Sequence, residues 1–411
     1  MNKKVKQTLL PKLRFPAFQN AEGWEKKELR PFLERYVEKV KSNTSLSVFS
    51  SSREGLLPQN EYYRGNKVIN DGEYGVVPEG YIVYRHMSDD ITFKFNINDN
   101  GRPIAVSKEY PVFWVNGLDP VFLRYLLNES RAFKDFAAMQ RKGGTRTRLY
   151  FETLCSWKAP LPTMPEQKKI SCFLSSIDKL IESEENELKA RQKYKVGLVQ
   201  QLFPLDGENL PTLRFPEYRG APEWSLHNGN QLFDPISNKD HDSDLPVLAI
   251  TQEHGAIPRE KINYHVSVSE KSIESYKVVE VGDFIISLRS FQGGIEYSEY
   301  KGLCSPAYVI LRKRKDFVSE YFKHYFKAGT FIQDLNKNIE GLRDGKMVSY
   351  KQFSDLLLPL PPSRDEQQKI ATCLTLIDEI IAQQSKKLEV LQKQKDGLMQ
   401  LLFPSDVEMI A

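Results

Sequence analysis

The segment Glu166-Gln167-Lys168-Lys169-Ile170 recurs about 200 positions later as Glu366-Gln367-Gln368-Lys369-Ile370. Three further patterns recur at the same interval: Leu-Pro-x-Leu-Arg-Phe-Pro at 10–16 and 210–216, tryptophan at 24 and 224, and Gly-Leu-x-Gln-x-Leu-Phe-Pro at 197–204 and 397–404. The chain therefore consists of two copies of one unit, and such a long-range repeat is settled before any local pattern. A protein made of two like halves usually binds a partner that is itself bipartite or two-fold.

The composition is that of a folded protein with several domains. The chain has 411 residues, of which 40% are hydrophobic and 27% are charged, and this length fits roughly two to four domains. No run approaches the roughly 18 consecutive apolar residues of a membrane helix. The basic start, Met1–Lys6, is not followed by the apolar segment of a secretory signal. We therefore expect a cytoplasmic location and no membrane partner.

No catalytic or metal-binding motif stands out in the sequence. The cysteines form no Cys-x-x-Cys pair and are not matched between the copies: Cys155, Cys172, Cys304 and Cys373. There is no phosphate-binding loop, dinucleotide turn or nucleophile elbow, and no Asn-Pro-Pro-aromatic run of the kind that amino-methyltransferases use. We expect reduced cysteines, no bound metal, no cofactor bound by this chain and no catalytic residue. Recognition remains as the function, and the net charge of only +4 implies that any phosphate-binding surface is local or shared with partners.

The well-matched tails of the two copies predict two long helices. Each tail opens on a capping-box pattern, Thr163-x-x-Glu166 or Ser363-x-x-Glu366, and each ends at a Phe-Pro pair. Apolar residues alternate steps of three and four along both tails, which is typical of a coiled coil. We predict that the helices pair along a seam formed by Ile177, Ile181, Glu184, Leu188, Lys195, Leu198 and Leu202 in the first copy and by Ile377, Ile381, Gln384, Leu388, Leu391, Lys395, Leu398 and Leu402 in the second. The alternative, two unrelated helices that each pack on their own body, fits the repeated heptad phase less well.

Polar residues within the seam favour one antiparallel register. In this register Glu184 lies opposite Lys395, and Lys195 lies opposite Gln384. A shift by one heptad would place Lys395 against Ile177, and burying an ammonium group against an isoleucine is costly. We therefore predict the first register.

The parts that precede the helices share little sequence and are predicted to be mixed α/β bodies. Strand-like runs lie at 81–84, 112–115, 278–287 and 307–311, and helical spacing lies at 120–136 and 317–335. We interpret the aromatic residues of the helical segments as core residues and not as a platform for stacking bases. The predicted order is a first recognition body at 1–158, a central helix at 159–204, a second body at 205–357 and a distal helix at 358–411. The predicted fold class is α+β, with two mixed domains separated by two long antiparallel helices that form a coiled coil with pseudo-two-fold symmetry.

Two basic, glycine-bearing segments precede the helices. The first is Arg141-Lys142-Gly143-Gly144-Thr145-Arg146-Thr147-Arg148, and Arg343-Asp344-Gly345-Lys346 holds the equivalent place in the second copy. Such segments suit close approach to phosphates, and a solvated basic loop without a ligand fits them equally well. Arg and Gln side chains read guanine and adenine edges, and several follow matching strand-like runs. The candidate DNA-binding residues are Arg85, His86, Arg141, Lys142, Arg146, Arg148, Arg289, Gln292, Arg343 and Lys346.

Four duplicated motifs carry a resemblance to a known family. They are the Pro-Leu-Pro hinge at 160–162 and 359–361, the Glu-Gln-x-Lys-Ile helix start, the Ile-Asp pair at 177–178 and 377–378, and the Leu-Phe-Pro stop. Together they resemble the DNA-specificity subunit of type I restriction-modification enzymes, and the resemblance spans the whole chain.

The resemblance implies that each body is a target-recognition domain that reads one half of a split double-stranded DNA target, while the helices set the unread spacer. It also implies docking of two modification subunits, which carry S-adenosylmethionine and methylate adenine, and of restriction subunits, which use ATP and Mg. This chain would itself catalyse nothing. Two alternatives stay open: a self-contained DNA methyltransferase or nuclease, and a protein adaptor that does not bind DNA.

Overall fold

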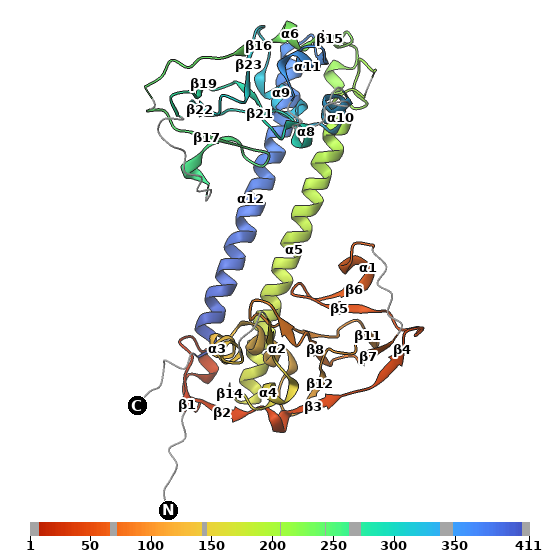
Figure 1. The fold of residues 1–411 in the computed structure, drawn as a ribbon, viewed down its shortest axis with the longest axis vertical. Helices are drawn as coiled ribbons and strands as arrows, with labels where there is room; N and C mark the ends of the chain where they lie inside the picture. Colours follow the sequence, from red (N-terminus) through yellow and green to blue (C-terminus); the bar gives the residue numbers. More distant parts are fainter. Residues whose placement is uncertain are drawn as a thin grey trace, which may run out of the picture. The chain divides into compact units, whose positions relative to one another are not determined.

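The chain forms two compact units, each with one mixed body and parts of two long helices. The structure is a computed structural model that describes residues 8–65, 72–141, 146–205, 207–242, 244–262, 273–337 and 348–404. One unit comprises Met1–Glu184 with Lys387–Ala411, and the other comprises Glu185–Lys386. The helices α5 (Met164–Leu202) and α12 (Arg364–Leu402) contribute residues to both units (Figure 1). The predicted α+β class is confirmed, and the boundaries predicted along the chain stay a prediction.

The first body consists mainly of short antiparallel strands. Its strands are β1 (Thr8–Leu9), β2 (Trp24–Glu28), β3 (Leu33–Tyr36), β4 (Lys39–Lys41), β5 (Phe49–Ser51), β6 (Leu56–Pro58), β7 (Glu73–Val77), β8 (Ile82–Tyr84), β9 (Met87–Ser88), β10 (Phe95–Ile97), β11 (Ile104–Ser107), β12 (Val112–Val115), β13 (Thr147–Arg148) and β14 (Lys158–Leu161). Its helices are α1 (Gln59–Tyr62), α2 (Pro120–Glu129), α3 (Arg131–Met139) and α4 (Phe151–Cys155), with 3-10 turns η1 (Pro16–Phe18) and η2 (Arg30–Phe32). The central sheet has the strand order β10-β8-β12-β3.

The second body also consists mainly of short antiparallel strands with helices. Its strands are β15 (Ser225–Asn228), β16 (Phe233–Ile236), β17 (Leu248–Thr251), β18 (Gly255–Pro258), β19 (Lys277–Val279), β20 (Phe284–Ile286), β21 (Glu296–Tyr297), β22 (Gly302–Cys304), β23 (Val309–Lys313) and β24 (Leu357–Leu360). Its helices are α6 (Gly229–Leu232), α8 (Ser290–Gly293), α9 (Ser319–Tyr325), α10 (Gly329–Lys337) and α11 (Tyr350–Ser354), with 3-10 turns η3 (Pro216–Tyr218) and η4 (Arg259–Lys261). The central sheet runs β21-β20-β23-β16, so two bodies with little common sequence share one topology.

The central strands are apolar throughout because both faces of the sheet are covered. In β8, Ile82 and Tyr84 belong to one apolar cluster, whereas Val83 belongs to another. In β20, Phe284 and Ile285 are divided between two clusters in the same way. All of these side chains are fully buried, which explains why a continuous apolar run marks each strand in the sequence.

Two predicted elements are interrupted. The run 278–287 forms β19 and β20 instead of one strand, because Gly282, at φ +93°, turns the chain between them. The helical segment 120–136 forms α2 and α3, because Ser130 is extended and its hydroxyl accepts a hydrogen bond from Phe133 N–H at 3.2 Å. Both breaks use residue types that punctuate regular structure.

The repeated motifs meet at a joint between each body and the start of a long helix. In the first unit, Arg14 donates through Nε and Nη2 to both carboxylate oxygens of Glu166 at 2.8 Å. The indole Nε1 of Trp24 donates to the same carboxylate at 3.2 Å. The Arg14 and Glu166 side chains are 7% and 1% exposed. Bidentate pairing satisfies both buried charges, so the arginine, tryptophan and glutamate of the repeat form one structural cluster.

The second unit contains the same joint. Arg214 donates to Glu366 at 2.7 and 2.8 Å, and Trp224 donates to it at 3.2 Å. The predicted capping boxes are therefore wrong for the glutamates. Their carboxylates accept hydrogen bonds from arginine and tryptophan and not from the backbone N–H at the start of their own helix. Part of the cap is present, because Ser363 Oγ accepts from the backbone N–H of Glu366 at 3.4 Å.

Each long helix ends in the core of the body from the other copy. Phe203, which follows α5, packs on Tyr321 of the second body at 5.4 Å between ring centroids. Phe403, which follows α12, packs on Trp24 and Phe122 of the first body. Within each unit, then, a helix end from one copy completes the core formed by the other copy.

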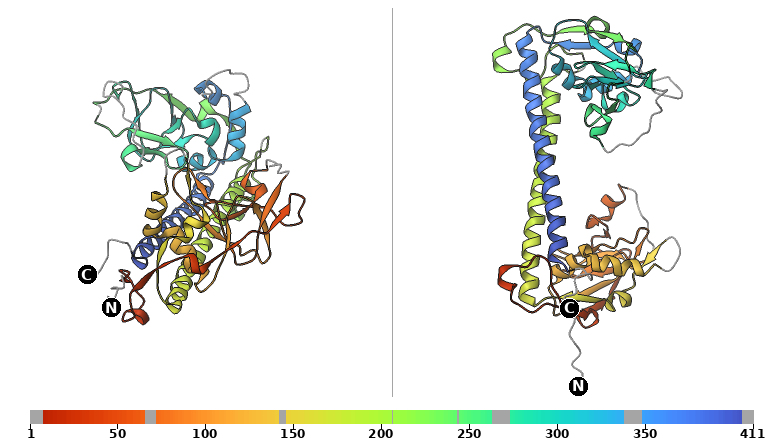
Figure 2. Two further views of the ribbon diagram at one scale, coloured as in Figure 1. Left: turned by 60° about the horizontal axis from the view of Figure 1, so that its bottom comes forward. Right: turned by 90° about the vertical axis from the view of Figure 1, so that its left-hand side faces the viewer.

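The helices run antiparallel, but the predicted register is wrong by one heptad. Lys387 contacts Glu184 at 2.6 Å, and Lys395 contacts Asp178 at 2.7 Å, so residue numbers rise along one helix as they fall along the other. The views in Figure 2 show the two helices side by side in each unit. Glu184 thus pairs with Lys387 and not with Lys395.

The observed register is the one that the sequence argument had excluded. It is tolerated because a lysine that lies opposite an isoleucine does not have to bury its ammonium group there. Lys395 extends to the carboxylate of Asp178, the neighbour of Ile177. Lys195 forms the equivalent ion pair with Asp378. A lysine stem can pack on apolar atoms while its charged end reaches a partner, and this reach removes the cost that the prediction assumed.

Candidate nucleic-acid interface

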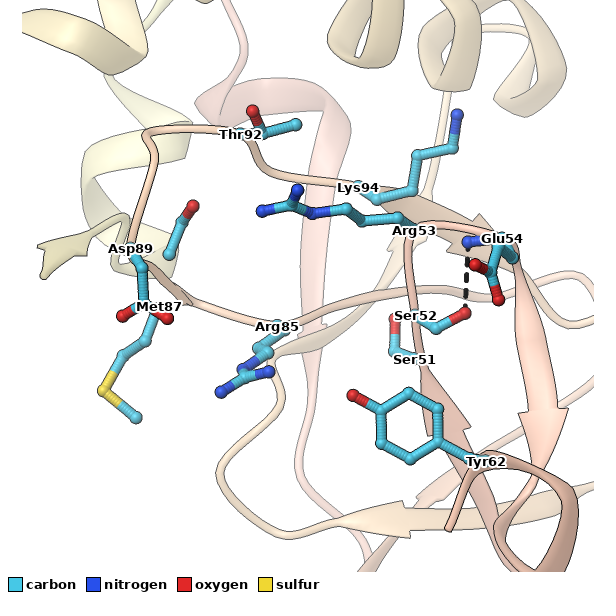
Figure 3. A pocket seen from close by; sticks show the side chains of 11 residues that line it. Ser51, Ser52, Arg53, Glu54, Tyr62, Arg85, Met87, Asp89, Thr92 and Lys94 are labelled. Carbon is cyan, nitrogen blue, oxygen red and sulfur yellow. Dashed lines mark hydrogen bonds between the residues drawn. The ribbon is translucent and has the colours of Figure 1, made fainter. Parts of the chain in front are cut away.

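Arg85 is the first residue after the central strand β8 and is exposed. It lines a polar hollow of about 370 Å³ whose wall also includes Arg53, Tyr62, Asp89 and Lys94 (Figure 3). Among the residues that the structure describes, the Arg85 guanidinium has no hydrogen bond or ion pair. The end of β8 therefore places the Arg85 guanidinium at an open, polar surface, where it could bind a base edge or a phosphate.

The other cations at this hollow have acidic partners. Arg53 contacts Asp90 at 2.6 Å, and Lys94 contacts Glu129 at 3.4 Å. The hydroxyl of Ser88 is the largest of the influences that lower the pKa of Asp90 to about 2. Sequence reasoning missed Arg53 and Lys94 as candidates, because their only signal was a single charge within a turn or a strand start.

His86 and Arg146 differ from Arg85 in their surroundings. The His86 ring stacks on Tyr150 at 5.9 Å, and burial lowers its pKa. Its Nδ1 is buried and has no hydrogen-bond partner among the described residues, so His86 is in part a packing residue. Arg146 forms an exposed ion pair with Asp89 at 2.8 Å. Exposed pairs contribute little to stability, so a phosphate could replace this carboxylate at small cost.

The remaining residues of the first basic segment are exposed or outside the description. Arg148 lies in β13, which pairs with β9, and its side chain is exposed. Arg141 is exposed just after α3. Lys142 lies outside the described residues, as do Arg343 and Lys346 of the second segment. The structure thus brings Arg85, Arg146 and Arg148 to the β9–β13 ribbon of the first body.

Arg289 and Gln292 occupy the matching place in the second body. They follow β20, the counterpart of β8, with Arg289 directly before the short helix α8 and Gln292 within it, and both side chains are exposed. Neither side chain forms a hydrogen bond or ion pair with another described residue. Each body therefore presents an unpaired arginine beyond the end of its central strand.

The predicted seam residues of the helices are all buried or half-buried. Glu184 and Gln384 are 7% and 8% exposed. Glu184 accepts from Lys387 at 2.6 Å, and Gln384 donates to Glu187 at 3.4 Å. Buried polar groups at such positions need partners, and here each partner comes from the facing helix.

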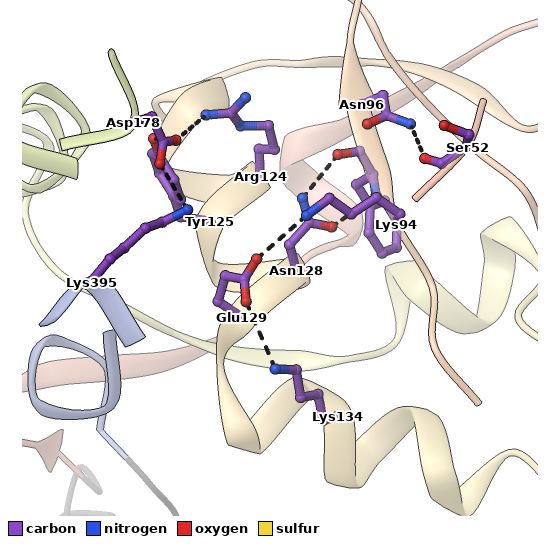
Figure 4. Close-up of polar contacts among 11 residues, drawn as sticks. Ser52, Lys94, Asn96, Arg124, Tyr125, Asn128, Glu129, Lys134, Asp178 and Lys395 are labelled. Atoms are coloured by element: carbon purple, nitrogen blue, oxygen red, sulfur yellow. Dashed lines mark hydrogen bonds and ion pairs between the residues drawn. The ribbon is translucent and has the colours of Figure 1, made fainter. Parts of the chain in front are cut away.

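Matched polar clusters tie each body to the helices. In the first unit, Tyr125 donates to Asp178 at 2.5 Å beside Lys395, as Figure 4 shows. Burial is the main cause that raises the pKa of Tyr125 to about 12. The cluster joins α2, α5 and α12, so it couples the recognition body to both helices of its unit.

The second unit has a histidine where the first has Tyr125. His324 Nε2 lies 3.0 Å from Thr375 Oγ1, and His324 Nδ1 lies 3.7 Å from Asp378. Burial lowers the pKa of His324 to about 4. The two clusters therefore hold the same place in the fold but respond differently to pH.

The described part of the chain offers no grouping of three His, Cys, Asp or Glu side chains suited to a metal ion. None of its helices is long and apolar enough to cross a membrane. All four cysteines are free thiols.

Two bodies of one topology, each with an unpaired arginine beyond its central strand, define a two-headed recognition protein. The chain belongs to the family of the type I restriction modification DNA specificity domain, whose model matches residues 60–191 and 227–393. It is a DNA-recognition subunit of a type I restriction-modification system and not a catalytic subunit of one. The resemblance inferred from the repeated motifs is thereby confirmed.

Relatives cover most of the chain. It is 24% identical over 426 residues to the putative type I restriction enzyme MjaX specificity subunit of Methanocaldococcus jannaschii, with 94% of each chain covered. It is 24% identical over 310 residues to the MjaVIII specificity subunit of the same organism, with 71% of each covered.

Solved structures show the same fold. The S subunit of a type I restriction-modification system from M. genitalium aligns with a TM-score of 0.59 at 16% identity, covering 97% of this chain and 100% of that one. A chain from a structure of the type I R-M system, described in terms of complex assembly and conformational transition, aligns with a TM-score of 0.53 at 17% identity and covers 93% of this chain and 98% of that one. At such identities the likeness establishes the fold alone.

Proposed function

We propose that each body reads one half of a two-part double-stranded DNA target. The observation that carries the proposal is the matched pair of exposed arginines, Arg85 and Arg289, beyond the matching strands β8 and β20. Neither guanidinium has a partner within the described part of the chain. A guanidinium can read a guanine edge bidentately. Arg146 and Arg148 beside Arg85 would contact phosphates, as would Arg141, Lys142, Arg343 and Lys346.

The long helices, in this proposal, set the unread spacer and dock two modification subunits. Their outer faces carry large apolar side chains that are 42% to 64% exposed: Leu180, Tyr194, Leu376, Ile380 and Val390. Leu180 and Ile380 hold the same position in the two copies, which suits two identical partners. Exposed apolar groups on a helix face are typical of a protein interface.

Catalysis would lie in those partners. Modification subunits would bind S-adenosylmethionine and methylate adenine, and restriction subunits would use ATP and Mg. The cytoplasm is the expected location, because double-stranded DNA is the proposed target. A self-contained methyltransferase or nuclease is not favoured, since the family is one of recognition subunits.

Duplex binding at several salt concentrations tests the proposal. We expect affinity to fall steeply with salt, because phosphate contacts release counterions, and the pure chain to transfer no methyl group from S-adenosylmethionine. An adaptor without a DNA role would show no salt-sensitive binding. Exchanging the first body for that of a relative should change only one half of the methylated target. A change in both halves would contradict one body per half-target.

Substitutions on the exposed faces of the long helices test the proposed docking of the modification subunits. Leu180→Asp or Ile380→Asp should each prevent binding of one modification subunit while duplex binding by the chain remains. The exposed Ser183→Asp variant, on the same helix as Leu180, is the matched control for one added negative charge. Full assembly by both apolar variants would contradict docking at these positions.

A further inference from the structure

The segment Ser287–Gly294 carries Arg289 and Gln292, includes the short helix α8 and is called the loop below. It is held by side chains from three other segments of the second body. Three side chains donate hydrogen bonds to the backbone carbonyls of alternate loop residues. Gln252 Nε2 donates to Arg289 at 3.2 Å, and Asn336 Nδ2 donates to Phe291 at 2.7 Å. Lys327 Nζ donates to Gly293 at 2.9 Å. A carbonyl held in this way cannot rotate without losing its partner, so the backbone is restrained along its length.

The end of the loop is also closely packed. Gly294 has φ +80°, and a Cβ at this position would lie 1.9 Å from the carbonyl oxygen of Phe326. A Cβ at Gly293 would lie 2.5 Å from the Gln252 side chain. Two adjacent glycines thus allow the loop to lie directly on α9's C-terminal turn and on Gln252.

The beginning of the loop is closed by its own serines. Ser287 N–H donates to Ser290 Oγ at 2.9 Å, and Ser290 N–H donates to the Ser287 carbonyl at 3.2 Å. Ser290 is 1% exposed. The backbone polar groups are therefore directed inward, while the side chains of Arg289 and Gln292 remain exposed.

Lys327 is anchored in turn by a buried carboxylate. Its ammonium group contacts Glu296 at 2.5 Å, and Glu296 is 2% exposed. Burial of the pair is the main cause that lowers the pKa of Lys327 and raises that of Glu296. This ion pair holds Lys327, one of the three donors to the loop, in position.

We infer that Gln252, Asn336 and Lys327 are positioning residues that fix the loop Ser287–Gly294, so that Arg289 and Gln292 meet base edges of the second half-target in one geometry. The inference rests on the proposed function. Bidentate contacts from Arg and Gln discriminate between bases only when the planes of their end groups are correctly placed. A preorganised loop also loses less conformational entropy on binding.

Asn336→Asp is the sharpest test, because it keeps the size of the side chain and replaces the donor with a carboxylate oxygen facing two carbonyls, those of Phe291 and Ile332. The full chain would be assembled with its modification partners. Binding would be measured on duplexes that carry single-base changes in either half-target. We expect discrimination in the second half to fall roughly tenfold and discrimination in the first half to stay within about twofold of the parent.

Gln333→Glu is the matched control, because Gln333 is exposed on the same helix and the change adds the same charge. It should lower affinity for all duplexes alike and leave discrimination intact. Gln252→Glu removes a second donor from a surface position, where misfolding is not a concern, and should lower second-half discrimination about threefold.

Unchanged second-half discrimination in Asn336→Asp and Gln252→Glu would overturn the inference, as would an equal loss in both halves. A parent chain that fails to bind duplex would instead overturn the proposed function. Loss of discrimination without a change in the midpoint of thermal unfolding would separate positioning from a merely structural role.

Discussion

The two recognition bodies share a sheet order but hold the segment beyond the central strand in different ways. In the first body this segment forms the β9–β13 ribbon, and Asp90 accepts from Ser88 at 2.9 Å and from Thr92 N–H at 3.2 Å. In the second body, side chains of Gln252, Asn336 and Lys327 hold the carbonyls. One order of central strands can therefore carry two unlike segments at the place where DNA binding is proposed.

The joints between bodies and helices show the opposite behaviour. Arg14, Trp24 and Glu166 repeat as Arg214, Trp224 and Glu366 with distances that agree within 0.1 Å. Gln167 and Gln367 also repeat their roles, accepting from a backbone N–H of the body at 3.0 and 2.9 Å. The residues that repeat in the sequence at the joints therefore also repeat in their contacts, whereas the segments beyond the central strands differ in both sequence and contacts.

The largest expected effect follows from lengthening one helix. Seven residues inserted into α5 alone, after Leu188, should abolish binding to the original target or shift it to a longer spacer, with a loss of about 100-fold or more at the original spacing. Target selection from random duplexes measures this. The same insertion in both helices is the control and should restore binding at a longer spacer. An unchanged spacer would contradict the proposal that the helices set its length.

Removing one joint tests whether the two joints are equal. Glu166→Ala leaves the buried Arg14 guanidinium without its carboxylate and should lower the free energy of unfolding by about 3 kcal/mol or more. Glu366→Ala should cost a similar amount, because its contacts are the same. Urea denaturation measures both, with the exposed Glu182→Ala as control. If only one of the two variants lost little free energy of unfolding, the two joints would differ in their contribution to stability.

The difference between Tyr125 and His324 predicts that the cluster of the second unit adds a pH dependence of stability that the matching cluster of the first unit lacks. The pKa of buried His324 is lowered to about 4 from an ordinary 6.5, so the unfolded chain binds the proton more readily. The stabilisation of the folded chain by the neutral His324 is complete above pH 6.5. It is lost as the pH falls toward 4, at up to about 1.4 kcal/mol of the free energy of unfolding per pH unit. His324→Tyr should remove this dependence in urea denaturation at pH 7 and 5. An identical pH profile in the variant would refute the role of this histidine.

A charge exchange distinguishes the observed helix register from the one predicted from the sequence. Glu184→Lys should destabilise the helix pair by about 1 kcal/mol. Lys387→Glu should restore stability, because these residues are in contact at 2.6 Å. Lys395→Glu should not restore it, since Lys395 contacts Asp178. Recovery with Lys395→Glu instead would favour the other register.

The smallest expected effect concerns the basic segment of the first body. Arg146→Ala with Arg148→Ala should weaken binding to every duplex alike and reduce the salt slope by about 1 for each phosphate that the chain no longer neutralises. Binding isotherms at several salt concentrations measure the slope. A weakening restricted to particular sequences would place these arginines among the base-reading residues.

Much of the fold could be predicted because its signals are local and periodic. The heptad spacing predicted both helices, and apolar runs marked the central strands of both bodies. The breaks at Gly282 and Ser130 were missed, although glycine and serine are the usual residues at such points. Of the candidate site, Arg85, Arg289 and Gln292 are exposed beyond matching strands, and whether they read bases stays a prediction.

The sequence by itself determined that the chain is two copies of one unit, that each copy ends in a long amphipathic helix, and which family it belongs to. Repetition and periodicity are properties of the order of residues along the chain, so no coordinates are needed to see them. Only the tertiary structure decided the helix register, the partners of Glu166 and Glu366, and the side chains that hold the loop at Arg289. Each of these depends on how far a flexible side chain reaches across space to a residue remote in the chain, and sequence spacing carries no information about that reach.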